Sequence, residues 1–233
     1  MSIDIQFNNV LGSALGIYMK KKPSIPAAQE VKEQIKVPGR DGNLLVRKGV
    51  YESTQIPVEF NYIGPEEKWG ERWRNAKKWL SAIDTEVKFT DDPDVFYKIS
   101  HVIVSENVKH GNRIGSFNAT FITKDGLSYL ESGKELVDIN EALVNPGILS
   151  KPIYTITGEG MCTLTVNEKS ITANVSGDLF IDTEKMICYR SDGTSQNTAV
   201  SGDYEDLFLQ EGENVISVTD GFECKVVPRW RCL

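Results

Sequence analysis

Two groups of carboxylates are the side chains best placed to do chemistry. Asp91, Asp92 and Asp94 lie close together in the sequence, and Asp182 lies two residues before Glu184. A pair of acids could hydrolyse a glycosidic bond, and neighbouring carboxylates could bind Ca²⁺. Both groups, however, fall in sequence typical of turns, where Asp is favoured for its local hydrogen bonds, and the EF-hand pattern is absent. We therefore predict turns rather than a catalytic or metal site.

The remaining reactive residues do not form a recognisable motif. Neither His101 nor His110 has a Ser or Cys in a nucleophile elbow, and His101 lies in a strand-like run where a packed histidine is expected. Gly158-Glu159-Gly160 is too short for a dinucleotide loop, and no Gly-x-x-x-x-Gly-Lys phosphate loop occurs. We expect no enzyme activity, no catalytic residue and no cofactor.

The cysteines are spread through the last third of the chain. They are Cys162, Cys188, Cys224 and Cys232, without a Cys-x-x-Cys pair. Both histidines are distant in sequence, so a zinc site is not expected. We expect thiols, as is usual for proteins that fold in a reducing cytoplasm, with a disulfide as the alternative.

Composition places the chain among globular proteins with an acidic surface. Of 233 residues, 40% are hydrophobic and 25% are charged, no apolar run is long enough to span a membrane, and the N-terminal residues do not resemble a secretion signal. We therefore expect folding in a cytoplasm. The net charge of −7 and the pI near 5.0 argue against a nucleic-acid-binding surface. The same acidity suits a surface past which nucleic acid slides without binding.

Residues 37–64 are predicted to form two strands that lead into a helix. Arg40-Asp41-Gly42-Asn43 contains the Asp-Gly pair typical of a tight turn, and a strand is expected to begin at Leu44. Residues 56–62 alternate apolar and polar side chains with the period of a half-buried strand. Pro57 lacks an N–H group and favours a strand edge or start.

Residues 65–83 are predicted to form an amphipathic helix. Gly64-Pro65-Glu66-Glu67 is a typical entrance, with Pro in the first turn and carboxylates near the positive end of the dipole. The apolar stripe at helical spacing consists of Trp69, Trp73, Ala76, Leu80 and Ile83. With Trp79 added, this is more aromatic surface than one short helix needs. Core packing is one explanation, and contact with another subunit is the alternative.

These elements belong to a predicted N-terminal antiparallel β domain, residues 1–135. Further strands are expected at 3–7, 87–90, 95–104 and 113–123, with a turn at Asp91-Asp92-Pro93-Asp94. Residues 28–37 fit either a strand or a short helix, and we prefer the strand because Pro38-Gly39 and the predicted turn follow at once. Residues 136–152 are predicted to be a linker, because periodicity fades and Pro and Gly interrupt it.

Residues 153–233 are predicted to form a β-sandwich. Short strands recur there at spacings of roughly 8 to 12 residues, separated by Gly, Asn and Asp. The predicted strands are 153–157, 162–166, 170–175, 179–182, 186–189, 215–218 and 223–227. The fold class is therefore mainly β.

The order and spacing of these segments resemble the distal tail protein (Dit) family of long-tailed siphophages over essentially the whole chain. In the first half the resemblance rests on Val37-Pro38-Gly39-Arg40-Asp41-Gly42-Asn43-Leu44-Leu45, Tyr51, Val58-Glu59-Phe60, Trp69, Trp73, Trp79 and Leu80. In the second half it rests on Gly177-Asp178-Leu179-Phe180-Ile181-Asp182, Asp192-Gly193, Asn197, Ser201-Gly202-Asp203, Leu207, Gly212-Glu213-Asn214-Val215-Ile216 and Pro228-Arg229-Trp230-Arg231. Gln210-Glu211-Gly212 departs from the family, which commonly has a proline before the glycine, and this alters one turn.

The resemblance implies a structural protein, in the short form without inserted carbohydrate-binding modules. Dit proteins form hexameric rings through the N-terminal domain, join the tail tube to the tail-tip or baseplate hub, and let DNA pass through the centre. A galectin-like C-terminal domain faces outward as a platform for adsorption proteins. By this resemblance, Arg40, Asp41, Trp69 and Trp73 are expected at the oligomer interface.

The resemblance also implies partners and a location. The partners are the other copies of a homo-hexamer, the tail tube and tape-measure proteins, the tail-tip hub or tail-associated lysin, and receptor-binding proteins. Sequence-specific nucleic-acid binding and membrane insertion are not expected. The implied location is the tail tip of a virion, after assembly in the bacterial host cytoplasm, whether the gene belongs to an active phage or a prophage.

The alternative function is a lectin. In this hypothesis the C-terminal sandwich itself binds saccharide of the host cell wall, which only the analogy of fold supports. The candidate saccharide contacts are Tyr189, Tyr204 and Trp230. Trp230 stands between Arg229 and Arg231 in a strand-like segment, where core packing is the competing explanation. A glycosidase is a more distant third hypothesis.

Overall fold

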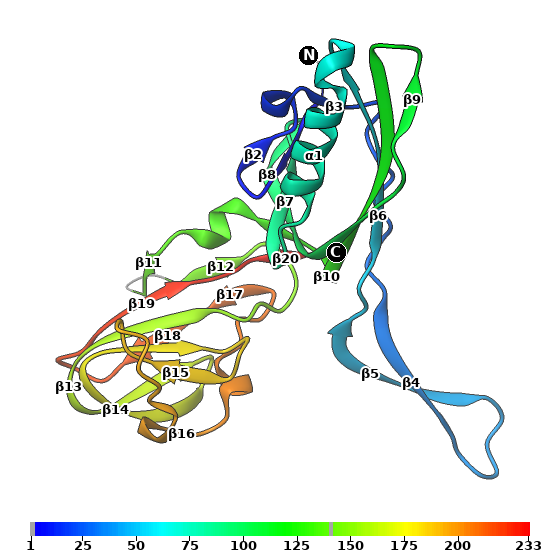
Figure 1. Ribbon diagram of the computed structural model, residues 1–233. Helices are drawn as coiled ribbons and strands as arrows, with labels where there is room; N and C mark the ends of the chain where they lie inside the picture. The colour runs from blue at the N-terminus through cyan, green and yellow to red at the C-terminus, as the bar shows by residue number, and fades with distance from the viewer. Residues whose placement is uncertain (1–2, 140–141) are drawn as a thin grey trace. The chain divides into compact units, whose positions relative to one another are not determined.

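The computed structural model describes residues 3–139 and 142–233, and this part is mainly β-structure with one α-helix (Figure 1). The predicted fold class is thus confirmed. The chain divides into two compact units: the first reaches Ser128, and the second covers Tyr129–Cys232, with Leu233 grouped with the first. The division falls before the boundary predicted at residue 135. No helix in the described ranges has the length and apolarity needed to cross a bilayer.

The first unit is built on a sheet with the strand order β2-β1-β7-β8-β10-β6-β3, and β9 pairs with β10. The strands are β1 (Ile5–Phe7), β2 (Val10–Leu11), β3 (Ile17–Met19), β6 (Gln55–Ile63), β7 (Thr85–Phe89), β8 (Asp92–Val104), β9 (Val108–His110) and β10 (Ile114–Leu130). The inward residues of β6 are buried at alternate positions, as predicted: Ile56, Val58, Phe60 and Tyr62. β3 covers only residues 60–62 of β6, so Pro57 lies where a missing N–H costs little.

Helix α1 (Trp69–Leu80) packs against this sheet after a 3₁₀ turn, η2 (Glu66–Lys68). Its first turns carry carboxylates and its last turn carries lysines, which suits the helix dipole. The helix is shorter than predicted. Because it ends at Leu80, Ile83 lies beyond it and is 70% exposed, so the prediction of Ile83 on the inner stripe was wrong.

Trp79 is the central aromatic residue of the first unit's core. Its indole Nε1 donates a hydrogen bond of 3.0 Å to the carbonyl oxygen of Phe7. Its ring meets those of Phe7 and Phe60 edge-on, each at a centroid distance of 6.0 Å. This tryptophan, which the predicted apolar stripe left out, therefore fixes the helix on the sheet.

The turn predicted at residues 91–94 is tighter than expected. Only Thr90 and Asp91 connect β7 to β8, because Asp92 already pairs with Phe89. Pro93 is thus in a strand, close to its start, where proline is tolerated.

The second unit contains a sheet with the order β11-β19-β13-β14-β15, with β16 paired to β14 and β18 to β13, and a small sheet of β12 and β17. The strands are β11 (Val137–Asp138), β12 (Leu143–Asn145), β13 (Ile153–Val166), β14 (Lys169–Asp182), β15 (Ile187–Tyr189), β16 (Val200–Ser201), β17 (Gly212–Asn214), β18 (Ile216–Val218), β19 (Glu223–Val227) and β20 (Arg231–Cys232). Short 3₁₀ turns of this unit are η3 (Glu131–Lys134), η4 (Asn197–Ala199) and η5 (Tyr204–Leu207), whereas η1 (Ser13–Leu15) belongs to the first unit.

Four of the predicted short strands are in fact two long ones, β13 and β14. The glycines taken as breaks lie inside the pair: Gly158 is opposite Gly177, with φ angles of 156° and 85°. Because glycine has no Cβ, it adopts such angles without breaking the ladder, so the strands continue through these positions.

Within the segment predicted to be a linker, the described residues 136–139 and 142–152 belong to the second unit, and residues 140–141 lie outside the described residues. β11 pairs with β19, and β12 pairs with β17. The C-terminal residues also bind this region. Ile148 N–H, within the segment, donates to the Arg231 carbonyl at 2.8 Å, and Leu130 N–H, just before it, donates to the Trp230 carbonyl at 3.2 Å. The Trp230 side chain is buried in the core of this unit.

Candidate functional site

The N-terminal carboxylates do not form a metal site. Asp91 accepts a hydrogen bond from Lys22 Nζ, which raises the pKa of that ammonium group. Asp92 and Asp94 belong to β8. No cluster of three or more His, Cys, Asp or Glu suited to a metal ion occurs within residues 3–139 and 142–233.

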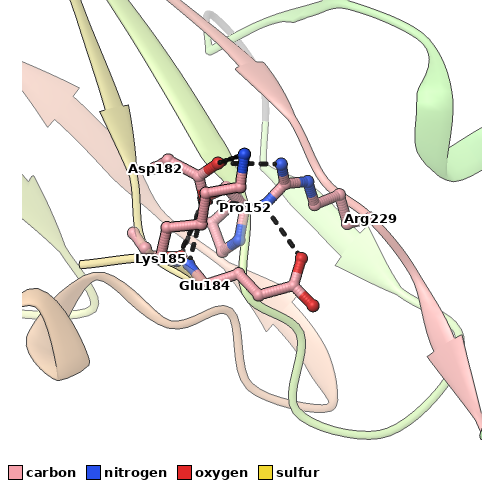
Figure 2. A network of polar contacts seen from close by, with 6 residues as sticks. Pro152, Asp182, Glu184, Lys185 and Arg229 are labelled. Atoms are coloured by element: carbon pink, nitrogen blue, oxygen red, sulfur yellow. Dashed lines mark hydrogen bonds and ion pairs between the residues drawn. The ribbon is translucent and has the colours of Figure 1, made fainter. Parts of the chain in front are cut away.

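Asp182 and Glu184 are held by one arginine, as Figure 2 shows. Arg229 donates from Nη1 to Asp182 Oδ1 at 2.8 Å and from Nη2 to Oδ2 at 3.1 Å. The same Nη1 lies 3.2 Å from Glu184 Oε2. Asp182 also accepts the backbone N–H groups of Glu184 and Lys185. Asp182 thus ends β14 as a buried ion-pair partner, and it makes the local hydrogen bonds predicted for a turn, because residues 183–186, which include Glu184, form a turn directly after it.

The environment of Asp182 does not suit acid catalysis. Burial alone would raise the pKa of this carboxyl, but the hydrogen bonds and charge of Arg229, with Lys185, outweigh burial and hold the pKa below its usual value. The general acid of a glycosidase needs a raised pKa. The Asp182–Arg229 pair therefore has a structural role.

The structure brings together one Ser–His pair that the sequence pattern did not reveal. His110 Nε2 and Ser116 Oγ lie 2.7 Å apart, beside a cavity of about 430 Å³ that Glu59 and Lys20 also line. Ser116 sits inside the regular strand β10, diagonally across from His110 on β9. Such a diagonal contact is ordinary between paired strands, and the sharp strand-to-helix turn of a nucleophile elbow is missing at Ser116.

The three C-terminal aromatic residues do not form a common surface. Tyr189 stacks on Phe180 at 5.4 Å. The Tyr204 hydroxyl instead points at the buried Cys188, 3.6 Å from its Sγ, and burial raises the pKa of Tyr204. Trp230 is 5% exposed and packs in the core, which leaves little ring face for a saccharide.

The cysteines carry thiols, and three of them are buried. Burial raises the pKa of Cys224 to about 12, with a smaller contribution from Cys162 nearby. Such thiols are poor nucleophiles and poor metal ligands at neutral pH.

The predicted turn at Arg40 and Asp41 is the tip of a two-stranded hairpin. β4 (Glu30–Lys36) and β5 (Asn43–Tyr51) pair only with each other in the described structure and form a sheet of their own (Figure 1). Gly39 and Gly42 have φ angles of 78° and 79°, which let the tip reverse. All residues of the hairpin from 38 to 50 are exposed.

Trp69 and Trp73 lie on the first turns of α1 and are half-buried. The Trp73 ring is 5.2 Å from that of Phe117, and the Trp69 ring is 6.3 Å from that of Tyr62. Trp69 Nε1 is buried without a hydrogen-bond partner among the described residues. Core packing therefore accounts for part of each ring, and a subunit contact at either one stays a prediction.

Comparison with known proteins identifies the fold. No protein-family model matches the sequence, and no curated protein matches it. The chain is similar to the crystal structure of SPP1 Dit (gp 19.1), described as a paradigm of the hub adsorption apparatus in phages that infect Gram-positive bacteria. The two are 12% identical, the match covers 97% of this chain and 98% of that one, and the TM-score is 0.71. The chain thus has a Dit-like distal tail protein fold, as the resemblance predicted.

Proposed function

We propose that this chain is a structural component of a phage tail that acts at the tail-tip hub. The observation that carries the proposal is the Dit-like fold across 97% of the chain and 98% of SPP1 Dit, so that both units have a counterpart. The carboxylates considered for acid catalysis have structural partners, since Asp182 is held by Arg229 and Asp91 by Lys22.

The finer proposal is a ring of six copies between tail tube and tail-tip hub, with DNA passing through the centre. A closed ring removes exposed sheet edges, and the exposed hairpin of the first unit supports association. The net charge of −7 suits DNA passage without tight binding. Arg40, Asp41, Trp69 and Trp73 are the proposed interface residues.

In this proposal the second unit is a galectin-like platform for adsorption proteins. The partners are the tail tube and tape-measure proteins, the hub or tail-associated lysin, and receptor-binding proteins. The protein assembles in the host cytoplasm and resides in the virion. The lectin hypothesis is not favoured, because Tyr204 points inward and Trp230 is buried.

Light scattering on a sizing column, with negative-stain images of the same peak, tests the ring. Six chains of 26.0 kDa have a mass of about 156 kDa, and we expect open-centred rings at that mass. A monomer that binds glycans in a screen would contradict the proposal and favour the lectin.

A further inference from the structure

A cavity of about 460 Å³ opens on the first unit where the β1–β2 hairpin and η1 lie beside helix α1 (Figure 1). Ligand-binding clefts commonly have volumes of roughly 300 to 1,000 Å³. None of the four residues proposed for the ring interface is among the described residues that line it. The lining residues come from two segments of the chain: Asn8, Val10 and Leu15 from the first, and Asn75, Lys78 and Trp79 from the helix.

The cavity arises at the edge of the sheet. Asn8 and Asn9 form the two-residue turn of the hairpin with φ angles of 50° and 60°, which asparagine adopts more readily than most residues. Val10 pairs with the buried Phe7, so both side chains lie on the face of the sheet that carries α1. Phe7 is covered by Trp79, whereas Val10 on the edge strand β2 stays 37% exposed. The helix therefore leaves an apolar gap beside it.

The lining combines apolar surface with free carboxamides. Val10, Leu15 and Trp79 offer a surface that can cover one aliphatic side chain. The carboxamide of Asn75 makes no hydrogen bond within residues 3–139 and 142–233, and that of Asn8 uses only its Oδ1 in the described structure. A carboxamide presents a donor and an acceptor, as a peptide group does. These side chains therefore suit a ligand with a peptide main chain.

The charge of the lining is positive. Lys78 is the one charged residue among the described lining residues. Its ammonium group has no hydrogen-bond or ion-pair partner in the part of the chain that the structure describes. Glu71, the only carboxylate of α1, is seven positions earlier and about 10 Å away along the helix axis. In a chain of net charge −7, this unpaired cation beside apolar surface complements a ligand that carries a carboxylate.

We propose that this cavity binds an acidic peptide segment of a partner protein, in which an aliphatic residue is followed by a carboxylate. The aliphatic side chain packs on Val10 and Trp79. The peptide group bonds to the carboxamide of Asn75, and the carboxylate pairs with Lys78. The proposed ring does not require this contact, so the inference goes beyond the proposed function.

A short synthetic peptide tests the cavity in the full chain. The probe is a tetrapeptide with blocked ends, in which a leucine followed by a glutamate stands between two serines. We expect saturable binding in isothermal titration calorimetry and a shift of the Trp79 indole signal in NMR spectra. Serine in place of the leucine should weaken binding at least about tenfold, because burial of the aliphatic side chain is lost. Glutamine in place of the glutamate should weaken it at least about threefold, because the ion pair is lost.

Adjacent residues of the chain provide matched controls. Lys78→Gln should weaken binding at least about threefold, whereas Lys77→Gln should change it less than about 1.5-fold. Lys77 Nζ lies instead over the Trp73 ring, 5.6 Å from its centroid. Val10→Ser should weaken binding at least about threefold, and the similarly exposed Leu11, on the opposite face of β2, should tolerate serine. With Lys78→Gln, the glutamine peptide should bind as well as the glutamate peptide, because both changes remove one ion pair.

The outcomes separate this inference from the proposed function. Absence of binding at millimolar peptide, or equal losses with Lys77→Gln and Lys78→Gln, overturns the site. A peptide that releases single chains from the assembled species in light scattering also overturns it, because the cavity is then covered by a second copy. Light scattering without peptide tests the ring by itself. A ring that binds no peptide rejects the site and keeps the proposed function, whereas a monomer that binds the peptide supports the site and counts against the ring.

Discussion

Arg229 donates two hydrogen bonds to Asp182, a partner 47 positions away, from a left-handed backbone conformation with φ of 55°. That conformation costs a non-glycine residue on the order of 1 kcal/mol. The bidentate hydrogen bond to the buried carboxylate of Asp182 holds Arg229 in this backbone conformation. It also fixes the neighbouring Trp230, whose ring completes the core of the second unit.

Removing the carboxylate should therefore destabilise the second unit. We expect Asp182→Ala to lower the free energy of unfolding by about 3 kcal/mol, because the Arg229 guanidinium stays partly buried without its main partner. Glu184→Ala, at the exposed end of the same network, should cost less than about 1 kcal/mol. Urea denaturation followed by circular dichroism at pH 7 measures both, and equal losses would contradict the prediction.

The same pair predicts how stability depends on pH. A carboxyl whose pKa is lower in the folded than in the unfolded chain stabilises fully above its unfolded value, taken as 3.8, and loses this contribution as pH falls through the folded value. The advantage of the wild type over Asp182→Asn should be constant from neutral to mildly acidic pH. It should shrink below the unfolded value. An advantage that grows in acid would falsify the assignment.

Two glycines of the first unit should respond to alanine with opposite signs. A Cβ on Gly115 would lie 2.2 Å from Tyr62 Cζ, and Tyr62 is 1% exposed and cannot retreat. Gly115→Ala should destabilise by about 2 kcal/mol or more. Gly70 lies within α1, where the nearest atom is Arg74 Nη1 at 3.5 Å, so Gly70→Ala should stabilise by about 0.5 to 1 kcal/mol. Thermal unfolding of both variants decides, and shifts of the same sign would refute the packing argument.

Substitutions of the helix tryptophans should have different effects, with Trp79 acting mainly on folding stability and Trp73 mainly on assembly. Trp79→Ala removes a core ring and its hydrogen bond, and should cost about 3 to 5 kcal/mol. Trp73→Ala, on a half-buried ring, should cost less and should weaken the assembled species. Denaturation and light scattering on each variant measure the two effects. Unchanged stability and unchanged mass for Trp73→Ala would remove it from the proposed interface.

The thiols should differ in reactivity. With the pKa of Cys224 raised to about 12 by burial, and Cys162 and Cys188 also buried, alkylation of the native chain at pH 8 should begin at the half-buried Cys232. Peptide mass mapping after a time course gives the order, and urea should make all four react at similar rates. Early modification of Cys224 would show that the second unit opens locally.

Local signals in the sequence were sufficient for the elements that local chemistry determines. The Asp41-Gly42 turn and the alternation of β6 act over a few residues, so they could be recognised without knowing the fold. The long strands could not, because Gly158 looks like a break until Gly177 is placed opposite it.

The candidate site residues also differ in whether local sequence or a distant partner determines their position. The tip position of Arg40 follows from its turn, but the partner of Asp182 lies 47 residues away, and nothing near Asp182 points to Arg229. Helical spacing likewise placed Trp69 on the inner stripe and left out Trp79, although both contact the core. Which residues of a helix contact the core depends on how the helix packs on its sheet, and the helical spacing of one segment does not specify that packing.

The closing segment of the second unit has a consequence for biosynthesis. Arg231 Nε donates to the Leu149 carbonyl at 2.7 Å across 82 positions, and Trp230 accepts from Leu130 N–H. On the ribosome, the first unit can collapse as soon as residues up to 128 have emerged, because domains generally fold as units during synthesis. The bonds of Leu130 and Leu149 to the closing segment can form only after residue 231 is made. A nascent chain stalled before that point lacks Trp230, so the core residues that its ring covers stay exposed to chaperones and proteases.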